Sequence, residues 1–474
     1  MNWKKKSMKS DKEDWIFFGK AGIGLNCLKD KYFSYILLGL CLAFYLFFSI
    51  FDGYVWCADT NTYVSMSIAR EPLYPLYLAF FRALIGGETR YLLAAVIGQG
   101  LLLGWAIWIL STYLHKVLKT PRFLYVVMVM CSLGVSLLCR FAARRGSMYS
   151  NSILSEGLAI PLFLIFFRFL YEYAITQSRK SMIWTLILSV LLIATRKQMF
   201  ISVALFGIVY FVCKVKEGKW FQGIWKGLLC AIAVVAVATV FDCATNYFVH
   251  GSFVRHANDN RFILTMVFFE ADREDGEKIE NEEIRELFYQ IYDDCEEAGY
   301  FAGRYGKDWY ERSTLFADHY DHIQLDTMYP AIQEYVIEKN QEGIQVNLGI
   351  DEVGSQIMNA VLPCVLGKMV ITSLDNIMNG LMTTVAVKMR ILIPYVYGIL
   401  VLYVVLLCYL WKTEGWSNTT VLATLILLAV IVNVCMVALV IFSQSRYTIY
   451  NMPLFYIGGC VMLYRIVMNK LKKQ

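Results

Sequence analysis

The stretch that decides the fold is Thr419–Phe442, TTVLATLILLAVIVNVCMVALVIF, which runs for 24 residues without a charged side chain. A helix needs about 20 consecutive apolar residues to cross the hydrocarbon core of a bilayer, so this stretch predicts a membrane span. The same scan finds nine further apolar runs: Tyr32–Ile50, Tyr91–Leu114, Phe123–Cys139, Ile153–Tyr171, Met182–Ala194, Phe200–Val212, Ile224–Phe241, Ile391–Trp411 and Ile449–Met468. The sequence therefore predicts an all-α polytopic membrane protein with about ten transmembrane helices in a lipid bilayer.

The composition of the whole chain agrees with this class. Of its 474 residues, 58% are hydrophobic and 17% are charged, whereas soluble domains average about 45–50% apolar and about 25% charged residues. These values exclude a soluble globular protein and a disordered chain. No segment is basic enough to follow a phosphate backbone, so nucleic acid is not an expected partner. The 13 Cys residues show no zinc-site spacing, and we interpret them as reduced, apolar side chains.

The distribution of Lys and Arg predicts the orientation of the spans. The first 31 residues contain eight Lys, and the connections after every second span are also basic. Cytoplasmic loops of membrane proteins carry this excess, so we expect both termini inside the cell. The first apolar run, Tyr32–Ile50, is not followed by a small-residue cleavage site. We therefore expect it to be a retained helix rather than a signal peptide.

One connection differs in charge from the rest of the chain. Between Gly251 and Glu352 there are 24 acidic and nine basic residues, a net charge of −15 against +6 for the whole chain. Its apolar residues recur at helical spacing, which predicts a helical extracytoplasmic subdomain whose acidity is a solvated surface. The stretch Leu362–Met389 mixes charged and apolar residues and is typical of an amphipathic interfacial helix.

These observations divide the chain into four regions. A basic cytoplasmic segment, 1–31, precedes a transmembrane module, 32–241, whose first outer loop, 51–90, is expected to hold interfacial helices. The acidic extracytoplasmic loop and the interfacial helix occupy 242–390. The C-terminal spans and a basic cytoplasmic tail occupy 391–474.

Charged side chains gather at the outer ends of the predicted spans, where Lys and Arg are normally scarce. They are Asp52, Asp59, Arg140, Arg144, Arg145, Glu156, Arg196, Lys197 and Arg446. An ionisable group at membrane depth is costly, so such residues are functional candidates. A phosphate group would explain the cations, because Arg binds it through two donors and Lys as a point charge. The alternative for each cation taken singly is pairing with lipid head groups or with the acidic loop.

Two carboxylates follow the first span. Asp59 lies four residues before Tyr63, so both side chains would share one face of a helix. A carboxylate at an apolar boundary suits a general base because desolvation raises its pKa, although a neighbouring Arg lowers the pKa again. Asp52 precedes Gly53, and we interpret it as a turn residue.

Four motifs, taken in order, resemble a known enzyme superfamily. Asp59-Thr60-x-x-Tyr63 comes after the first span and is followed by a Pro- and Tyr-rich stretch, 72–77. The other three are Ile153-Leu-Ser-Glu-Gly-Leu158, Thr195-Arg-Lys-Gln198 and the Arg446-Tyr447 pair with Pro453. The series resembles the C-type integral-membrane glycosyltransferases, which include protein O-mannosyltransferases and the aminoarabinose transferases of lipid A. The resemblance covers 30–245 and 390–470 and leaves the acidic loop unmatched.

The resemblance implies a polyprenyl-phosphate-linked sugar as donor. It implies a glycan, lipid or protein acceptor at the outer face of a bacterial cell membrane. Asp59 would be the catalytic base that activates the acceptor, and Arg446, with Arg196 or Lys197, would hold the lipid phosphate. The remaining candidates are Arg144 and Arg145 for the donor phosphate, and Glu156, Tyr63, Gln198 and Tyr447 for orienting sugar or acceptor.

The sequence departs from the superfamily pattern at two points. Thr60 follows Asp59 where some members have a second acidic residue. We therefore assign no metal ligands and expect a metal-free mechanism, with dependence on a divalent metal left open. Arg70-Glu71-Pro72 stands where the aminoarabinose group has Lys-Pro-Pro, so a phosphate contact by Arg70 is only a hypothesis.

Two other functions fit parts of the pattern. A lipid-linked glycan ligase or polymerase would place its catalytic residues in the large loop, where Arg255 with His256, or His319 with His322, are available. The His pair also has the spacing of two metal ligands, although a solvated helix face is the simpler interpretation. A transporter or flippase would show internal repeats and polar groups in mid-membrane. The sequence has no such repeat, and its polar residues cluster at span ends.

Overall fold

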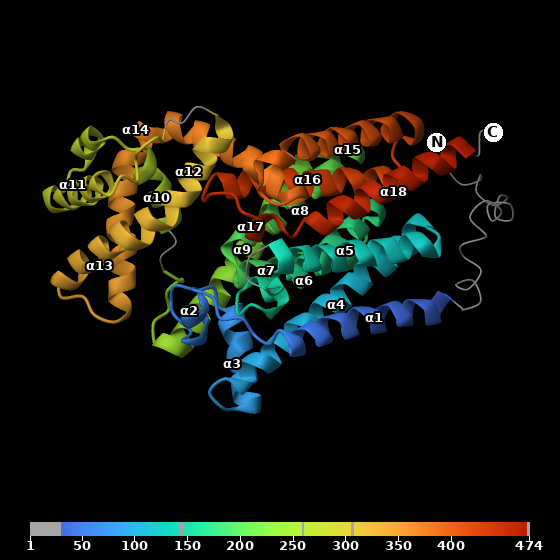
Figure 1. Cartoon of the computed structure of the whole chain (residues 1–474), viewed down its shortest axis with the longest axis horizontal. Helices are drawn as coiled ribbons and strands as arrows, with labels where there is room; N and C mark the ends of the chain where they lie inside the picture. The colour runs from blue at the N-terminus through green and yellow to red at the C-terminus, as the bar shows by residue number, and fades with distance from the viewer. Residues whose placement is uncertain (1–29, 143–145, 258–259, 305–307, 472–474) are drawn as a thin grey trace.

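The computed structural model describes residues 30–142, 146–257, 260–304 and 308–471. Within these ranges the chain forms helices α1–α18 and short helical segments η1–η5, with no β-strand. One isolated bridge joins Val55 to Ser152. Long helices form a bundle, and a second group of helices lies beyond one of its ends (Figure 1). The predicted all-α polytopic class is confirmed.

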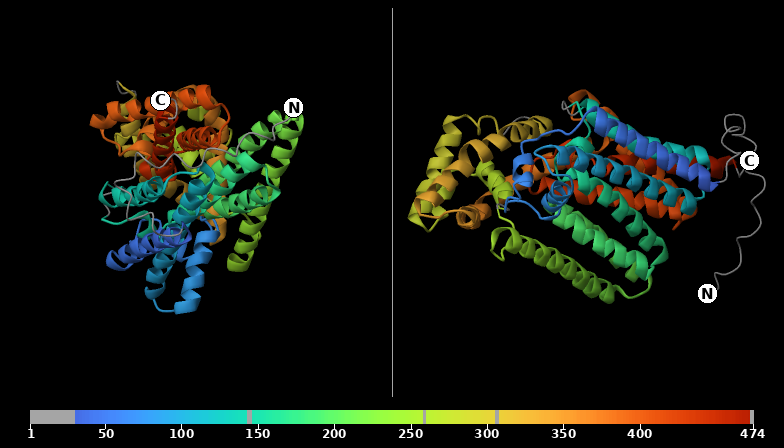
Figure 2. Two further views of the ribbon diagram at one scale, coloured as in Figure 1. Left: turned by 90° about the vertical axis from the view of Figure 1, so that its right-hand side faces the viewer. Right: turned by 90° about the horizontal axis from the view of Figure 1, so that it is seen from below.

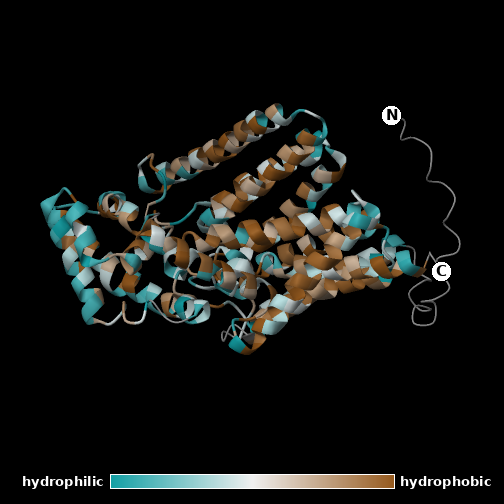
Figure 3. Cartoon of the chain, turned by 90° about the horizontal axis from the view of Figure 1, so that it is seen from above, coloured by the Kyte–Doolittle hydropathy of each residue, from teal (hydrophilic) through white to brown (hydrophobic). Residues whose placement is uncertain are grey.

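Ten helices of the described chain are long and apolar enough to cross a membrane. They are α1 (Asp30–Phe51), α4 (Arg90–Leu118), α5 (Arg122–Ala142), α6 (Glu156–Thr176), α8 (Ile201–Lys216) with the turn η2 (Lys197–Phe200), α9 (Trp220–His250), α14 (Ile344–Val385), α15 (Ile393–Glu414) with η5 (Arg390–Leu392), α16 (Asn418–Ala438) and α18 (Met452–Leu471). Apolar residues dominate the bundle and hydrophilic ones the group of helices beyond it (Figure 3). The start of α1 and the end of α18 lie at the bundle end remote from that group (Figure 2).

The membership of this set differs from the prediction at two places. α7 (Arg179–Thr195), which contains the predicted run Met182–Ala194, has 17 residues and is shorter than the ten. Most of the interfacial helix predicted over Leu362–Met389 belongs to one 42-residue helix, α14, which ends at Val385 and is itself long and apolar enough to span. In the first half of α14, Ile350 and Ile357 are buried among other helices outside the bundle.

The helices beyond the bundle form one compact unit with its own apolar core. We call it the acidic subdomain; it comprises α10 (Arg261–Glu270), η3 (Arg273–Lys278), α11 (Glu282–Glu297), α12 (Trp309–Asp321), the π-helical segment η4 (His322–Met328), α13 (Tyr329–Glu338) and the first half of α14. Phe268, Phe288 and Phe316 are fully buried at its centre. The charged faces of its amphipathic helices point away from this core, which explains how so acidic a segment folds.

Two short helices of the first loop, α2 (Thr60–Val64) and α3 (Leu73–Ile85), lie at the subdomain end of the bundle (Figure 1). The backbone around Val55 bonds to the segment before α6: Val55 N donates to Asn151 O over 2.8 Å, and Ile153 N donates to Val55 O over 3.0 Å. The amide of Gln99 in α4 donates to Ser150 O and Ser152 O over 2.7 and 3.0 Å. These bonds hold the first loop and the start of α6 in a fixed relation.

Candidate active site

Five charged residues from separate parts of the chain meet at the subdomain end of the bundle. We call Asp59, Arg70, Glu156, Arg196 and Arg446 the charged cluster. Arg446, in the short helix α17 (Ser445–Thr448), lies between the two carboxylates. Its Nη2 is 2.9 Å from Asp59 Oδ2, and its Nε donates to Glu156 Oε1. Arg70 Nη2 lies 2.7 Å from Asp59 Oδ1, and Arg196 pairs with Glu156.

Glu156 is the buried anchor of the cluster. It is the first residue of α6, where the positive end of the helix dipole favours a carboxylate. Its side chain is 0% exposed and contacts the guanidinium groups of both Arg196 and Arg446. A carboxylate buried to this extent is stable only when such partners neutralise it. Glu156 therefore holds two cations that come from the α7–η2 turn and from α17.

Asp59 lies at the rim of the cluster, at the N-cap position of α2. Burial raises the pKa of Asp59, but Arg70 and Arg446 lower it by more, so the pKa lies well below the ordinary range of an aspartate. With both guanidinium groups in place, Asp59 is ionised and only weakly basic. A change in either pair would therefore be needed before this carboxylate accepts a proton readily.

Arg70 is held by side chains of α2. Its Nε donates to Thr62 Oγ1 over 2.7 Å, and its guanidinium lies over the Tyr63 ring, 4.6 Å from the centroid. The Tyr63 hydroxyl donates to Ser155 Oγ over 3.1 Å, next to Glu156. Asp59 and Tyr63 thus contact the same guanidinium, as their helical spacing suggests. From the sequence, a phosphate contact by Arg70 was only a hypothesis. In the structure, Arg70 is the nearest ion-pair partner of Asp59.

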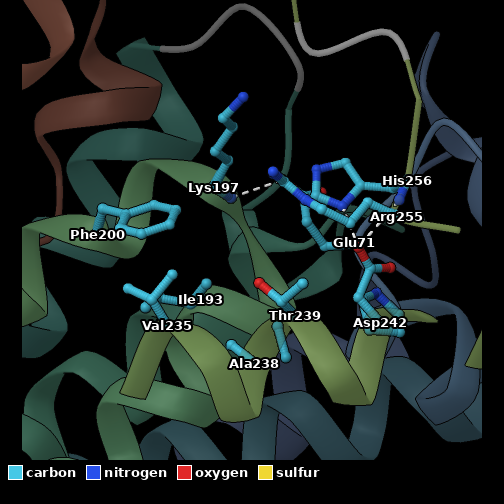
Figure 4. A pocket seen from close by; sticks show the side chains of 12 residues that line it. Glu71, Ile193, Lys197, Phe200, Val235, Ala238, Thr239, Asp242, Arg255 and His256 are labelled. Atoms are coloured by element: carbon cyan, nitrogen blue, oxygen red, sulfur yellow. Dashed lines mark hydrogen bonds and ion pairs between the residues drawn. The ribbon is translucent and has the colours of Figure 1, made fainter. Parts of the chain in front are cut away.

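Consecutive residues of the α7–η2 turn point to different places. Arg196 enters the cluster, with its guanidinium 5.0 Å from the Tyr447 ring centroid. Gln198 Nε2 donates to Tyr447 O over 2.7 Å, which ties the turn to α17. Lys197 instead lines a separate hollow with Arg255 and His256 (Figure 4). Of the two alternatives that the sequence left open, Arg196 lies in the cluster with Arg446 and Lys197 lies at the separate hollow.

Arg140, another predicted outward cation, pairs with a carboxylate other than those of the cluster. Arg140 forms a two-bond ion pair with Asp52, at 2.7 and 2.9 Å. Asp52 lies in a bend before Gly53, which has a positive φ, so the predicted turn is present and its carboxylate is also an ion-pair partner. Arg144 and Arg145 lie outside the described residues.

The histidines that a ligase would use belong to two different parts of the chain, each with its own partner. His256 bonds through Nδ1 to Asp242 at 2.6 Å, in the hollow that Lys197 lines. In the subdomain, His322 bonds to Asp326 at 2.6 Å, and the His319 ring packs 5.7 Å from that of Tyr300. In the part of the chain that the structure describes, no group of three or more His, Cys, Asp or Glu is arranged to hold a metal ion.

Sequence reasoning missed two residues that the acidic subdomain brings to the cluster. Burial and the nearby charge of Arg70 lower the pKa of Arg261. Burial and the nearby charge of Asp59 raise the pKa of Asp321, which lies at the junction of α12 with the π-helical segment η4. Such segments are rare and are frequent at functional sites. Neither residue lies in a motif, and only the folding of the subdomain onto the bundle places them here.

The cluster has the composition of an anion site. Three guanidinium groups face two carboxylates, which leaves one positive charge without a counter-charge inside the cluster. The neighbouring bundle is apolar, so an anion with a long apolar substituent would fit both environments. No protein-family model, curated protein or solved structure matches this chain.

Proposed function

We propose that the protein is a glycosyltransferase that moves a sugar from a polyprenyl-phosphate carrier to a glycan, lipid or protein acceptor. The observation that carries the proposal is the excess positive charge of the cluster at the end of an apolar bundle. A sugar linked through a phosphodiester has one negative charge, which matches this excess, and its polyprenyl chain suits the bilayer. The resemblance of the four motifs supports the same donor. We further propose that the cluster faces the outside of a bacterial membrane, with both termini in the cytoplasm.

In the proposed reaction, an acceptor hydroxyl oxygen forms a bond to the anomeric carbon while the bond from that carbon to the phosphate oxygen breaks. The bonding electron pair leaves with the lipid phosphate, and the proton of the hydroxyl passes to Asp59. Arg446 and Arg196 stabilise the charge that develops on the phosphate, so the leaving group needs no proton. A single displacement of this kind inverts the anomeric centre.

The ion pairs of Asp59 suggest an order for these events. A donor phosphate competes with Asp59 for Arg446, whose Nη2 is 2.9 Å from the carboxylate. When Arg446 turns to the phosphate, Asp59 keeps only Arg70, and its pKa rises toward the range of a useful base. Donor binding would therefore activate the carboxylate that the acceptor needs.

The test is transfer by the purified full chain from polyprenyl-phosphate sugars in lipid nanodiscs. We expect Asp59→Asn to lower kcat by about 10²–10⁴-fold, the usual contribution of a general base. Arg446→Lys keeps the charge but loses the two-donor geometry, so we expect it to weaken donor binding. Asp293→Asn is the matched control, because Asp293 also accepts two bonds from an Arg but is about half exposed on the subdomain surface. Wild-type rates in Asp59→Asn would refute the assigned base.

A further inference from the structure

Asn433 is the only amide side chain in the apolar stretch Thr419–Phe442. It lies in α16, near the end of the helix at Ala438, and is 1% exposed. A buried amide in a membrane span is costly unless it is hydrogen-bonded, and such amides commonly bond across to other helices. The partners of Asn433 therefore indicate its role.

Both ends of the Asn433 amide bond to segments that carry arginines of the charged cluster. Gln198 Nε2, in η2, donates to Asn433 Oδ1 over 3.0 Å. Asn433 Nδ2 donates to Tyr447 O, in α17, over 3.0 Å. Gln198 Nε2 also donates to Tyr447 O, over 2.7 Å. These three bonds form a closed ring between η2, α16 and α17, which we call the amide triangle.

The amide triangle lies next to the two cations that share Glu156. Arg196 comes two residues before Gln198, and Arg446 directly precedes Tyr447. The guanidinium groups of Arg196 and Arg446 both contact Glu156, although two like charges repel each other. The triangle joins the two backbone segments to a buried span. The separation of the two cations therefore does not depend on Glu156 alone.

We propose that Asn433 is a positioning residue, which holds Arg196 and Arg446 at the separation at which both bind the phosphate of the lipid carrier. This inference rests on the proposed function. A phosphate competes with carboxylates for guanidinium donors, so both arginines must stay in place when their bonds to Glu156 weaken. Donors that are already held in place bind an anion without the cost of ordering them. Asn433 acts on the phosphate only through Gln198 and Tyr447.

Asn433→Leu tests the role because it keeps the branched shape of the side chain and removes both of its bonds. Gln198 Nε2 and Tyr447 O keep the bond between them, so neither group loses its last partner. An apolar side chain also suits a membrane span. We therefore expect the variant to unfold at the wild-type temperature or a higher one, in a thermal melt of the full chain.

Binding is measured by calorimetry on the full chain in nanodiscs, with empty nanodiscs to correct for ligand that dissolves in lipid. The probes share one chain and differ in the head group: farnesyl phosphate, farnesoate and farnesol. We expect Asn433→Leu to weaken farnesyl phosphate binding by about 10-fold, roughly the contribution of one charge-assisted hydrogen bond. A planar carboxylate pairs with a single guanidinium through two bonds. Farnesoate should therefore lose less affinity, and farnesol none.

Two features of this assay separate positioning from a structural defect. A loss of folded protein lowers the binding stoichiometry but leaves the dissociation constants and their ratio unchanged. Asn246→Leu is the matched control, because Asn246 is a 5% exposed amide near the end of α9 that donates to Val254 O over 2.9 Å. This control lies outside the amide triangle and should bind all three probes as the wild type does.

The possible outcomes are distinct. A larger loss for farnesyl phosphate than for farnesoate, in a variant of undiminished stability, supports the inference. Equal losses for the two anions, no loss, or a lower unfolding temperature overturns the positioning role of Asn433 and leaves the proposed function standing. A wild-type protein that binds farnesyl phosphate no better than farnesol overturns both proposals.

Discussion

Glu156→Gln tests whether the charged cluster is held together by its buried carboxylate. The side chain of Glu156 is 0% exposed, and the two cations that it contacts, Arg196 and Arg446, are 13% and 16% exposed. The substitution keeps the shape of the side chain but leaves two nearly buried guanidinium groups facing each other. Breaking a buried pair by removing one charge costs about 3–5 kcal/mol. We therefore expect the unfolding equilibrium to shift by about two to four orders of magnitude.

A double-mutant cycle with Arg196→Met isolates the interaction. Arg196→Met leaves Glu156 paired with Arg446, and the double variant removes one charge of each sign. We expect the double variant to be more stable than the sum of the single effects predicts, by about 0.5–3 kcal/mol. The free energies come from equilibrium unfolding of the purified protein in mixed micelles, followed by tryptophan fluorescence.

The test of Glu156→Gln has a control variant and a refuting result. Glu311→Gln removes a half-exposed carboxylate that pairs with Arg390, and such surface pairs contribute about 0–1 kcal/mol. If Glu156→Gln costs no more than this control, or if the two single effects add, the carboxylate does not hold the cluster and the reasoning is wrong.

Three further predictions concern pH and packing. Because the pKa of Asp59 is depressed, the stabilisation from its pairs is complete above the unfolded-state pKa of about 4 and is lost only as the pH falls through the lower folded value. The unfolding free energies of the wild type and Asp59→Asn should therefore differ by a constant amount from about pH 5 to about pH 8. Burial lowers the pKa of Lys388 to about 8, whereas the unfolded chain keeps this proton up to about pH 10. Stability should thus rise over that window, and Lys388→Met should abolish the rise in a pH series of melting temperatures. Gly157→Ala places a methyl group against the Gln99 amide and should cost about 1–3 kcal/mol in unfolding, whereas Gly134→Ala, with open space around its Cβ position, should not destabilise.

Hydropathy and charge predicted the bundle and much of the cluster. Each long apolar run defines a helix, and charged residues at alternate ends of these runs fall at one end of the bundle because the spans alternate in direction. Asp59, Glu156, Arg196 and Arg446 were expected to share a site on this ground, and the structure brings all four into contact. These four residues are far apart in the chain, so only the topology of the spans brings them together.

The other features of the site depend on tertiary contacts, which no local sequence pattern reveals. Lys197 follows Arg196 directly, yet the extended backbone at Arg196 and the turn after it send the two side chains to different places. The pairing of Arg140 with Asp52 joins residues 88 positions apart. Phe268 and Phe288 belong to a segment that the sequence indicated was a solvated acidic surface, yet both are fully buried in the core of the acidic subdomain.

The central claim is that the charged cluster binds the phosphate of a lipid carrier. The most direct test is an experimental structure of the full chain with a polyprenyl phosphate in nanodiscs. We expect the phosphate to lie among Arg70, Arg196 and Arg446, with Asp59 released from Arg446. A phosphate located instead in the hollow lined by Lys197 and Arg255, with both ion pairs of Asp59 intact, would contradict it.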